Sequence, residues 1–403
     1  MPTPPLVFSQ LSTQATQALS QYVSEHLPLS FPACDITVMH RHERVFQGAW
    51  GSCEGIAPMP GRHWDIASIT KLFTTTCIFG LCSKGALQLD TPVGEWIPEF
   101  VRTPLRPMEA GQNPHSLARE PLPGDRQGQV VDARTITLRQ LLTHTSGLQA
   151  WRALFLELGD TPPPPGEPAQ VDPLSRAQTA MDWIGRCGFK DRPGQSVAYS
   201  DLGFMLLGEI ASRCAQKPLA QVMQEMIFSP LSLMDTGFHP ALSRANTLPT
   251  ELDLRWRGRR AWGEVHDENA CAMGGVAGHA GLFSTANDVA LLGQAWLPGQ
   301  GSALALAPLL RQQATQVQAE DATQKRGLGF MIKAPTNASC GTCFSPQSYG
   351  HTGYTGTSLW IDPEAQLVVA CMSNAVYGGR DMKMQPFRQG LHDLVWQSVA
   401  TRR

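Results

Sequence analysis

Strand-forming segments lie at the two ends of this chain, and helical patterns fill its middle. Residues 35–40 and 44–50 are β-rich runs separated by turn-like polar residues, which predicts a hairpin. Because strands from both ends need partners, we expect them to share one antiparallel sheet. The remaining patterns predict helices at 11–27, 68–84, 137–143, 176–187, 202–215, 219–228 and 385–399, and strands at 327–333, 346–351, 356–361 and 366–373.

This order predicts an α/β (α+β) fold in which the N- and C-terminal helices flank an antiparallel sheet and an all-helical domain is inserted. We assign residues 1–66 and 275–403 to the sheet domain and residues 67–274 to the helical domain. Long loops are expected at 101–135, which is rich in Pro, Gly and Arg, and at 159–175, which contains the stiff stretch TPPPPGEP. The 403 residues, 42% of them hydrophobic, suffice for a large core.

Charge and hydropathy argue against nucleic acid and a membrane as partners. Net charge is -2 and no basic stripe is present, so nucleic acid is not an expected partner. The N-terminus has no cationic start and no unbroken apolar run, and no window approaches the roughly 18 apolar residues of a membrane span. We therefore expect a soluble cytoplasmic protein, or a periplasmic one if a leader has been removed. The sequence leaves the oligomeric state open.

Ser68 and Lys71, in DIASITK, lie three residues apart at the start of a predicted helix. If that helix begins near Ala67, both side chains lie on one face of its first turn. A serine hydroxyl attacks at neutral pH only when a base takes its proton, and a lysine among apolar neighbours can lose its own proton and become that base. The pattern S-x-x-K alone is weak, because a capping serine followed by an ordinary lysine is its more common explanation.

Two further segments add candidate chemistry. PGQSVAYSDLGFMLLGEI, at 193–210, places Tyr199 on a loop just before an apolar helix. A phenol near a cation can share or accept a hydroxyl proton, although Tyr199 could also serve packing alone. In SYGHTGYTGTSLWIDPE, at 348–364, His351, Thr352 and Gly353 lie on a predicted strand, which a substrate backbone can approach closely at the glycine. The alternative there is an edge strand with a surface histidine.

These three segments resemble the S-x-x-K, Y-x-N/S and K/H-T-G motifs of the β-lactamase-related serine hydrolases. That family includes class C β-lactamases, penicillin-recognising DD-peptidases and β-lactamase-like esterases. Two more stretches, ITLRQLLTHTSGL at 136–148 and GEVHDENACAMGGVAGHAGLFSTANDVA at 263–290, are similar as well. The similarity runs in the family's order from about residue 35 to residue 375. It implies a β-lactamase/transpeptidase-like fold and a hydrolase that works without a cofactor.

The resemblance also implies roles for individual residues. Ser68 would be the nucleophile, Lys71 its proton partner, and Tyr199 the general base or proton shuttle. How the base role divides between Lys71 and Tyr199 stays open. The backbone N–H groups of Ser68 and Tyr354 would form the oxyanion hole. The expected substrate-binding residues are Asp201, His351, Thr352, Gly353 and Tyr354, with His351 near the substrate's carboxylate or leaving group.

Two departures from the family pattern weaken the case for an efficient β-lactamase. His351 stands where a lysine is frequent, and a histidine that is only partly charged near neutral pH holds a carboxylate less firmly. Asp201 stands where β-lactamases usually carry Asn, whose amide donates to a substrate carbonyl as an ionised carboxylate cannot. Asp201 could instead pair with Lys71, raise the pKa of that lysine and leave more of the proton work to Tyr199. Both changes favour an esterase or a peptidase-like amidase.

A metal site is a competing interpretation of His266, Asp267, Glu268 and His279. No H-E-x-x-H or similar spacing occurs among them, so we expect a structural or substrate-loop role and no bound metal. The chain also lacks the G-x-S-x-G sequence of an α/β-hydrolase nucleophile.

The sequence therefore predicts a serine hydrolase that forms an acyl-enzyme on a small-molecule ester, an amide or a short peptide, with weak β-lactam turnover. The principal alternative is a catalytically inactive protein that keeps this fold as a binding or scaffold module. A metallohydrolase is the third hypothesis.

Overall fold

The computed structural model describes residues 6–59, 61–158, 173–238, 244–299, 303–381 and 383–400. Its main feature is a nine-stranded antiparallel sheet, in the order β1-β3-β2-β16-β15-β14-β13-β12-β11. The two chain ends meet inside it, because β2 pairs with β16 along the whole of β16, from His40 opposite Leu367 to Cys34 opposite Ser373. The strands are β1 (Leu6–Ser9), β2 (Ala33–His40), β3 (Glu43–Gly51), β11 (Ala319–Glu320), β12 (Lys325–Arg326), β13 (Met331–Ile332), β14 (Tyr349–Thr352), β15 (Ser358–Asp362) and β16 (Leu367–Ser373).

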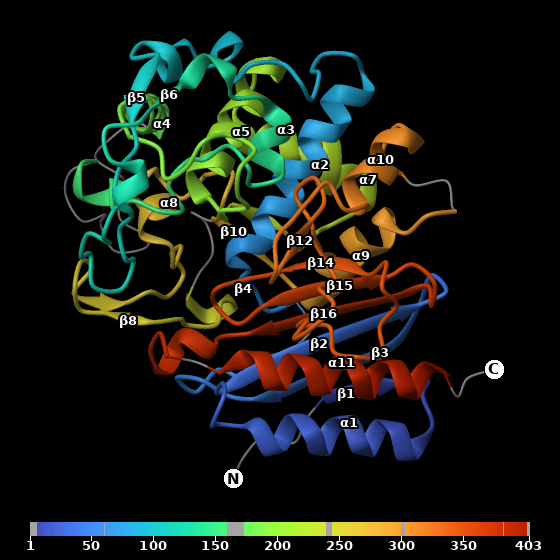
Figure 1. Ribbon diagram of the computed structural model, residues 1–403. Helices are drawn as coiled ribbons and strands as arrows, with labels where there is room; N and C mark the ends of the chain where they lie inside the picture. The colour runs from blue at the N-terminus through green and yellow to red at the C-terminus, as the bar shows by residue number, and fades with distance from the viewer. Residues whose placement is uncertain are drawn as a thin grey trace.

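Helices α1 (Thr13–His26) and α11 (Met384–Ala400) lie side by side on one face of this sheet (Figure 1). The rings of Tyr22 and Phe387 stack between them at 5.8 Å. Alternate residues of the central strands, such as Ile36 and Val38 of β2, face these helices and form one core cluster with them. The predicted antiparallel sheet with flanking terminal helices is thus confirmed.

The opposite face of the sheet is covered by α9 (Ala286–Trp296), a helix that the sequence interpretation missed. Thr285 caps it by accepting the N–H of Asp288 at 3.2 Å. Gly293 permits the close packing, because a Cβ at this position would lie 2.6 Å from a Val368 methyl carbon. The helix is apolar on most faces, so its hydrophobic pattern alone does not separate it from a buried strand.

The helical region stands above that face (Figure 1), with α2 buried at its centre. This region also holds short hairpins, β5–β6 within the 101–135 excursion and β8–β9 further on. The α-helices and strands not yet named, most of them in this region, are α2 (Thr70–Ser83), α3 (Leu138–Leu142), α4 (Pro173–Ile184), α5 (Asp201–Ala215), α6 (Leu219–Met223), α7 (Ser229–Leu231), α8 (Glu268–Ala272), α10 (Pro308–Thr315), β4 (Trp64–Asp65), β5 (Leu105–Pro107), β6 (Val130–Asp132), β7 (Gly237–Phe238), β8 (Leu252–Asp253), β9 (Arg259–Arg260) and β10 (Leu282–Ser284).

Several element bounds differ from the sequence-based ones. The strand predicted at 327–333 is replaced by the two-residue strands β12 and β13, between which Gly329 turns the chain at a φ of +82°. The strand predicted at 346–351 begins only at Tyr349. The polyproline stretch at 161–168 lies outside the described residues. The division into two domains at residues 66/67 and 274/275 stays a prediction. Among the described helices, none combines the length and the apolar character of a membrane span.

Candidate active site

Ser68 lies in a short, strained turn between β4 and α2. A 3-10 turn (Ala67–Ile69) precedes the α-helix, which begins at Thr70 and so later than the sequence suggested. Ala67 has a φ of +46°, a left-handed conformation that costs free energy for a residue with a Cβ. The buried carboxylate of Asp65 offsets part of that cost by accepting the Ala67 N–H at 2.8 Å. The strain orients Ser68 at the start of a rigid, buried helix.

Two side chains reach the Ser68 hydroxyl. Lys71 Nζ donates to Ser68 Oγ at 2.9 Å from the next turn of the same segment. The Tyr199 hydroxyl donates to the same oxygen at 2.9 Å, although the two residues are 131 positions apart. Tyr199 lies on the loop just before α5, and Ser200 caps that helix by accepting the Gly203 N–H at 3.3 Å. The structure therefore brings the three predicted catalytic side chains together.

Lys71 is fully buried and carries its charge in the resting state. Its Nζ lies 2.7 Å from Asp201 Oδ1 and donates to the His279 carbonyl at 3.0 Å. Burial alone would lower the pKa of Lys71, but Asp201 and the oxygen of Tyr199 outweigh it and hold that pKa above its ordinary value. The contact with Asp201 therefore favours a charged amine over the neutral amine that desolvation alone would favour. The pairing with Asp201 that was the alternative is present.

Tyr199 is a phenol in the same resting state. Burial raises its pKa, and the neighbouring Lys71 ammonium offsets only part of that effect. Lys71 Nζ also lies 4.9 Å from the centre of the Tyr199 ring. Any step that needs a Tyr199 phenolate thus depends on the positive charge of Lys71 for stabilisation.

His351 lies on β14, an interior strand of the sheet, and is 2% exposed. Its Nδ1–H donates to its neighbour's carbonyl, that of Thr352, at 2.8 Å. Burial, followed by the charges of Lys71 and Arg326, holds the pKa of His351 well below its ordinary value. The expectation of a partly charged imidazole is corrected in direction, because burial and the neighbouring cations favour the neutral form of His351 over the charged one.

Gly353 connects the end of β14 to the turn that carries Ser68. A Cβ on Gly353 would lie 2.0 Å from Thr357 Oγ1 and 2.7 Å from the Ile66 carbonyl oxygen. Thr357 Oγ1 in turn donates to that carbonyl at 3.1 Å, and Thr355 Oγ1 donates to the carbonyl of Asp65 at 2.8 Å. The glycine is therefore required for the strand to pack against the Ser68 turn, whereas the sequence suggested only access for a substrate.

A cavity of about 470 Å³ opens on one side of Ser68, and two of the arginines that line it have no carboxylate partner in the described part of the chain. Arg326 is 7% exposed and Arg388 is 9% exposed. Within the described ranges, neither guanidinium has a carboxylate at ion-pair distance. Arg326 donates to the Gln324 amide oxygen at 2.8 Å, and Arg388 donates to the carbonyls of Gly353 and Thr357. Burial lowers the pKa of Arg388 to about 10, so both cations are retained at neutral pH. The cavity also contains Tyr199, Met331, His351, Thr352, Tyr354 and Arg380.

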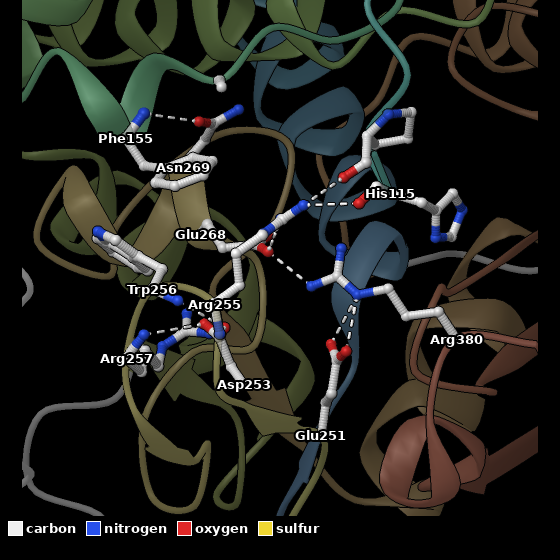
Figure 2. A network of polar contacts seen from close by, with 12 residues as sticks. His115, Phe155, Glu251, Asp253, Arg255, Trp256, Arg257, Glu268, Asn269 and Arg380 are labelled. Carbon is white, nitrogen blue, oxygen red and sulfur yellow. Dashed lines mark hydrogen bonds and ion pairs between the residues drawn. The ribbon is translucent and has the colours of Figure 1, made fainter. Parts of the chain in front are cut away.

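A second cavity of about 300 Å³ opens on the other side of Ser68. Part of its wall is the segment 111–120 of the predicted excursion, which contributes Gly111, Gln112, Pro114 and Glu120. Figure 2 shows how that wall is attached: Arg255 donates to the carbonyls of Pro114 and His115 at 3.2 and 2.9 Å, and to Glu268 at 2.9 Å. Tyr354, 42% exposed, lines both cavities.

Arg380 stands at the border of the two cavities, but its charge is already neutralised. It pairs with Glu251 at 2.8 Å and with Glu268 at 2.6 Å (Figure 2). Unlike Arg326 and Arg388, it has no unbalanced charge to offer a bound anion.

The histidines and acids of residues 266–279 form separate pairs. His266 Nε2 lies 2.8 Å from Glu251, and His279 Nε2 lies 2.9 Å from Asp267. In the part of the chain that the structure describes, no three His, Cys, Asp or Glu side chains are grouped to hold a metal ion. The His266 ring stacks on Tyr354 at 5.8 Å, and the backbone N–H of His266 donates to Asp65 Oδ2 at 2.7 Å. These contacts tie the segment to the wall of the site.

Comparison with known proteins adds three findings. The model of the family described as Beta-lactamase matches residues 20–393. The Escherichia coli (strain K12) protein named "Putative D-alanyl-D-alanine carboxypeptidase" is 30% identical over 386 residues, covering 88% of this chain and 81% of that protein. Two solved structures share the fold. EstCE1, "a hydrolase with promiscuous acyltransferase activity", has a TM-score of 0.69 at 18% identity and covers 95% of this chain and 98% of its own. The β-lactamase/D-alanine carboxypeptidase of Yersinia pestis has a TM-score of 0.64 at 21% identity and covers 95% and 99%.

Proposed function

The chain belongs to the β-lactamase family of serine hydrolases, and from this premise we propose that it cleaves an amide bond next to a free carboxylate. Ser68 would attack the carbonyl and hold the acyl group as an ester, which water then hydrolyses. One observation carries the proposal: Ser68 Oγ, 2.9 Å from both Lys71 and Tyr199, lies where two cavities meet, and one of them contains two buried arginines without carboxylate partners.

Tyr199 would first lose its own proton to solvent, and its phenolate oxygen would then take the proton of Ser68. Lys71, held as an ammonium by Asp201, stabilises the phenolate form of Tyr199 that accepts this proton. The same phenol could then return the proton to the leaving amine. In this scheme Lys71 acts by its charge, and the base role that the sequence left open belongs to Tyr199. The N–H groups of Ser68 and Tyr354 remain the proposed oxyanion donors.

The arginine-lined cavity would bind the leaving group. A guanidinium recognises a carboxylate with charge-assisted hydrogen bonds, and Arg326 has donors free for that purpose because Gln324 engages only part of it. The 300 Å³ cavity would then bind the acyl side of the substrate. The name of the Escherichia coli relative supports a peptide that ends in D-alanyl-D-alanine.

Efficient β-lactam hydrolysis is not part of the proposal. Asp201 lies 2.7 Å from Lys71 Nζ as its acceptor, and its side chain lacks the N–H with which an asparagine would donate to the amide carbonyl of a bound penicillin. We expect a penicillin to acylate Ser68 and to be released slowly.

A substrate panel on the wild type and Ser68→Ala tests this function. It compares a D-alanyl-D-alanine peptide, the same peptide as its C-terminal amide, a short-chain p-nitrophenyl ester and nitrocefin. We expect the free-acid peptide to give the highest kcat/KM, and Ser68→Ala to lose nearly all turnover of every substrate while keeping its Tm. Intact-mass analysis with a fluorophosphonate should find one adduct, on the peptide containing Ser68.

Three results would contradict the proposal. An adduct on another residue would refute Ser68 as the nucleophile. Binding of peptide and penicillin without any adduct would favour the inactive binding or scaffold protein. Equal turnover of the free acid and its amide would favour an esterase and remove the role given to the arginines.

A further inference from the structure

His144 occupies a backbone position that usually belongs to glycine or asparagine. Helix α3 ends in a paired reverse-turn cap, in which Thr145 N–H donates to the Gln140 carbonyl at 2.9 Å and His144 N–H donates to that of Leu141 at 3.2 Å. His144 adopts the left-handed conformation that this cap requires, with a φ of +58°. A histidine has no advantage for such a cap by itself. Its side chain must therefore be explained by what it contacts.

Those contacts lie on both sides of Tyr199. The Ala198 N–H donates to the His144 carbonyl at 2.8 Å, and the Ser200 N–H donates to His144 Nδ1 at 3.0 Å. The ring of His144 lies against the ring of Tyr199, with 4.6 Å between their centres. His144 thus accepts hydrogen bonds from the two amides that flank Tyr199, and its ring packs against the Tyr199 ring.

The hydrogen bond from Ser200 fixes the chemical state of the imidazole. Nδ1 accepts an N–H, so in the neutral ring the hydrogen is on Nε2. The side chain is 2% exposed, and its burial, followed by the positive charges of Arg326 and Lys71, holds the pKa of His144 well below its ordinary value. Nε2 is buried and has no hydrogen-bond partner in the described part of the chain. Burying such a donor costs free energy, which indicates that the ring is kept for its other nitrogen and its flat face.

We propose that His144 is a positioning residue. Its hydrogen bonds to the amides on both sides of Tyr199 hold the phenol within hydrogen-bond distance of Ser68. The inference rests on the proposed function, because it assumes that Tyr199 moves the Ser68 proton. His144 itself does not touch the reacting oxygen. It acts by reducing the number of places that the phenol can occupy, since reacting groups must be held near their productive geometry.

Two substitutions separate the contacts of the His144 side chain with the Tyr199 segment from the role of the residue 144 backbone in capping α3. His144→Gly keeps the left-handed backbone and the carbonyl acceptor but removes the ring and its nitrogen. His144→Asn also suits that backbone, and its amide oxygen can stand close to the position of Nδ1. We expect His144→Gly to lower the rate constant for Ser68 acylation by a fluorophosphonate by about 100-fold, the effect of misplacing a reacting group. His144→Asn should recover most of that loss. In steady state the effect should lie in kcat, with KM little changed.

Hydrogen exchange read by mass spectrometry gives a measurement that is independent of catalysis. Protection of the peptide that contains Ser200 should fall in His144→Gly and persist in His144→Asn, with equal Tm values. Equal acylation rates for wild type and His144→Gly would overturn the proposal, and so would a loss in His144→Asn as large as in His144→Gly. If His144→Gly does not fold, His144→Asn decides alone, and an acylation rate about 100-fold below the wild type or lost protection of the Ser200 peptide in that variant would overturn the proposal. A wild type that forms no adduct on Ser68, or a Tyr199→Phe variant with full acylation, would instead refute the proposed function.

Discussion

Arg326 is a buried cation whose charge no neighbouring carboxylate balances in the described part of the chain. Its guanidinium lies 5.4 Å from the centre of the Tyr199 ring and donates to a neutral amide, that of Gln324. Keeping such a charge away from water costs free energy, which a bound anion would recover. The neutral form of His351 is favoured in the same cavity, which leaves the arginines as the groups that can bind a substrate carboxylate.

Arg326→Gln should therefore abolish the preference for a free carboxylate. Because a hydrogen bond to a charged group contributes about 1.5–3 kcal/mol, we expect kcat/KM for the D-alanyl-D-alanine peptide to fall roughly 10- to 100-fold. Turnover of the C-terminal amide should change little, since it offers no charge. The measurement is kcat/KM for acid and amide with both proteins. A loss of equal size for the two peptides would show that Arg326 supports the fold of the site and does not select the substrate.

At the scale of elements, the segment 111–120 forms a wall that Arg255 and the hydrogen bond from Ala153 N–H to Gln112 Oε1 attach to the rest of the site. Arg255 joins its carbonyls to Glu268, and Glu268 also holds Arg380 at the border of the two cavities (Figure 2). The excursion at 101–135 thus contributes to the site, a point that its composition left open. Without regular structure at its tip, this wall depends on such side-chain attachments for its position.

Removing this attachment should weaken binding of large acyl groups. In Arg255→Ala we expect KM for a peptide substrate to rise about tenfold, the effect of losing one or two charge-assisted hydrogen bonds, with kcat nearly unchanged. A p-nitrophenyl acetate, which is too small to need the wall, should be hydrolysed as by the wild type. Arg134→Ala is the matched control, because Arg134 lies in the same excursion and pairs with Asp132 at its surface. Equal changes in both variants would contradict a specific role of Arg255.

At the scale of the whole molecule, the centre of the large sheet contains an isolated acid. Asp35 lies on β2 and is 1% exposed. In the described structure its oxygens lack a hydrogen-bond partner of good geometry, and the nearby Ile36 N–H offsets only part of the cost of burial. Burial raises the pKa of Asp35 from 3.8 to about 7. The folded protein therefore keeps a proton that the unfolded chain releases between these two values, and its stability falls as pH rises through that window.

Asp35→Asn removes this loss of stability. From pH 5 to pH 8 the variant should gain on the wild type by about 3 kcal/mol in the free energy of unfolding, because its amide stays neutral throughout. Urea denaturation at four pH values measures the difference. Asp90→Asn is the control, since Arg139 holds the pKa of that surface carboxylate below its ordinary value and no gain at high pH follows. A difference between Asp35→Asn and wild type that does not change with pH would refute the argument.

Much of the fold could be predicted from local patterns. The hairpin at 35–50, the buried helix after Ser68 and the closing helix depend on periodicity that neighbouring residues define, and each appears within a few residues of its predicted bounds. The helix α9 was missed because a short run of mostly apolar residues is compatible with a buried strand as well as with a buried helix. His144 lies in the stretch 136–148, whose pattern assigns it no role. The cavity arginines, Arg326 in β12 and Arg388 in α11, carried no signal, because an isolated arginine in a strand or a helix has no recognisable pattern.

The sequence by itself determined where the segments lie and which side chains could do chemistry, including the three-residue spacing of Ser68 and Lys71 that one helical turn makes into a contact. Only the tertiary structure decided that Tyr199 completes this group, that the charged form of Lys71 is favoured and that the neutral form of His351 is favoured. The reason is that a side chain's charge state depends on its burial and on neighbours within a few ångströms, and long-range packing brings those neighbours together.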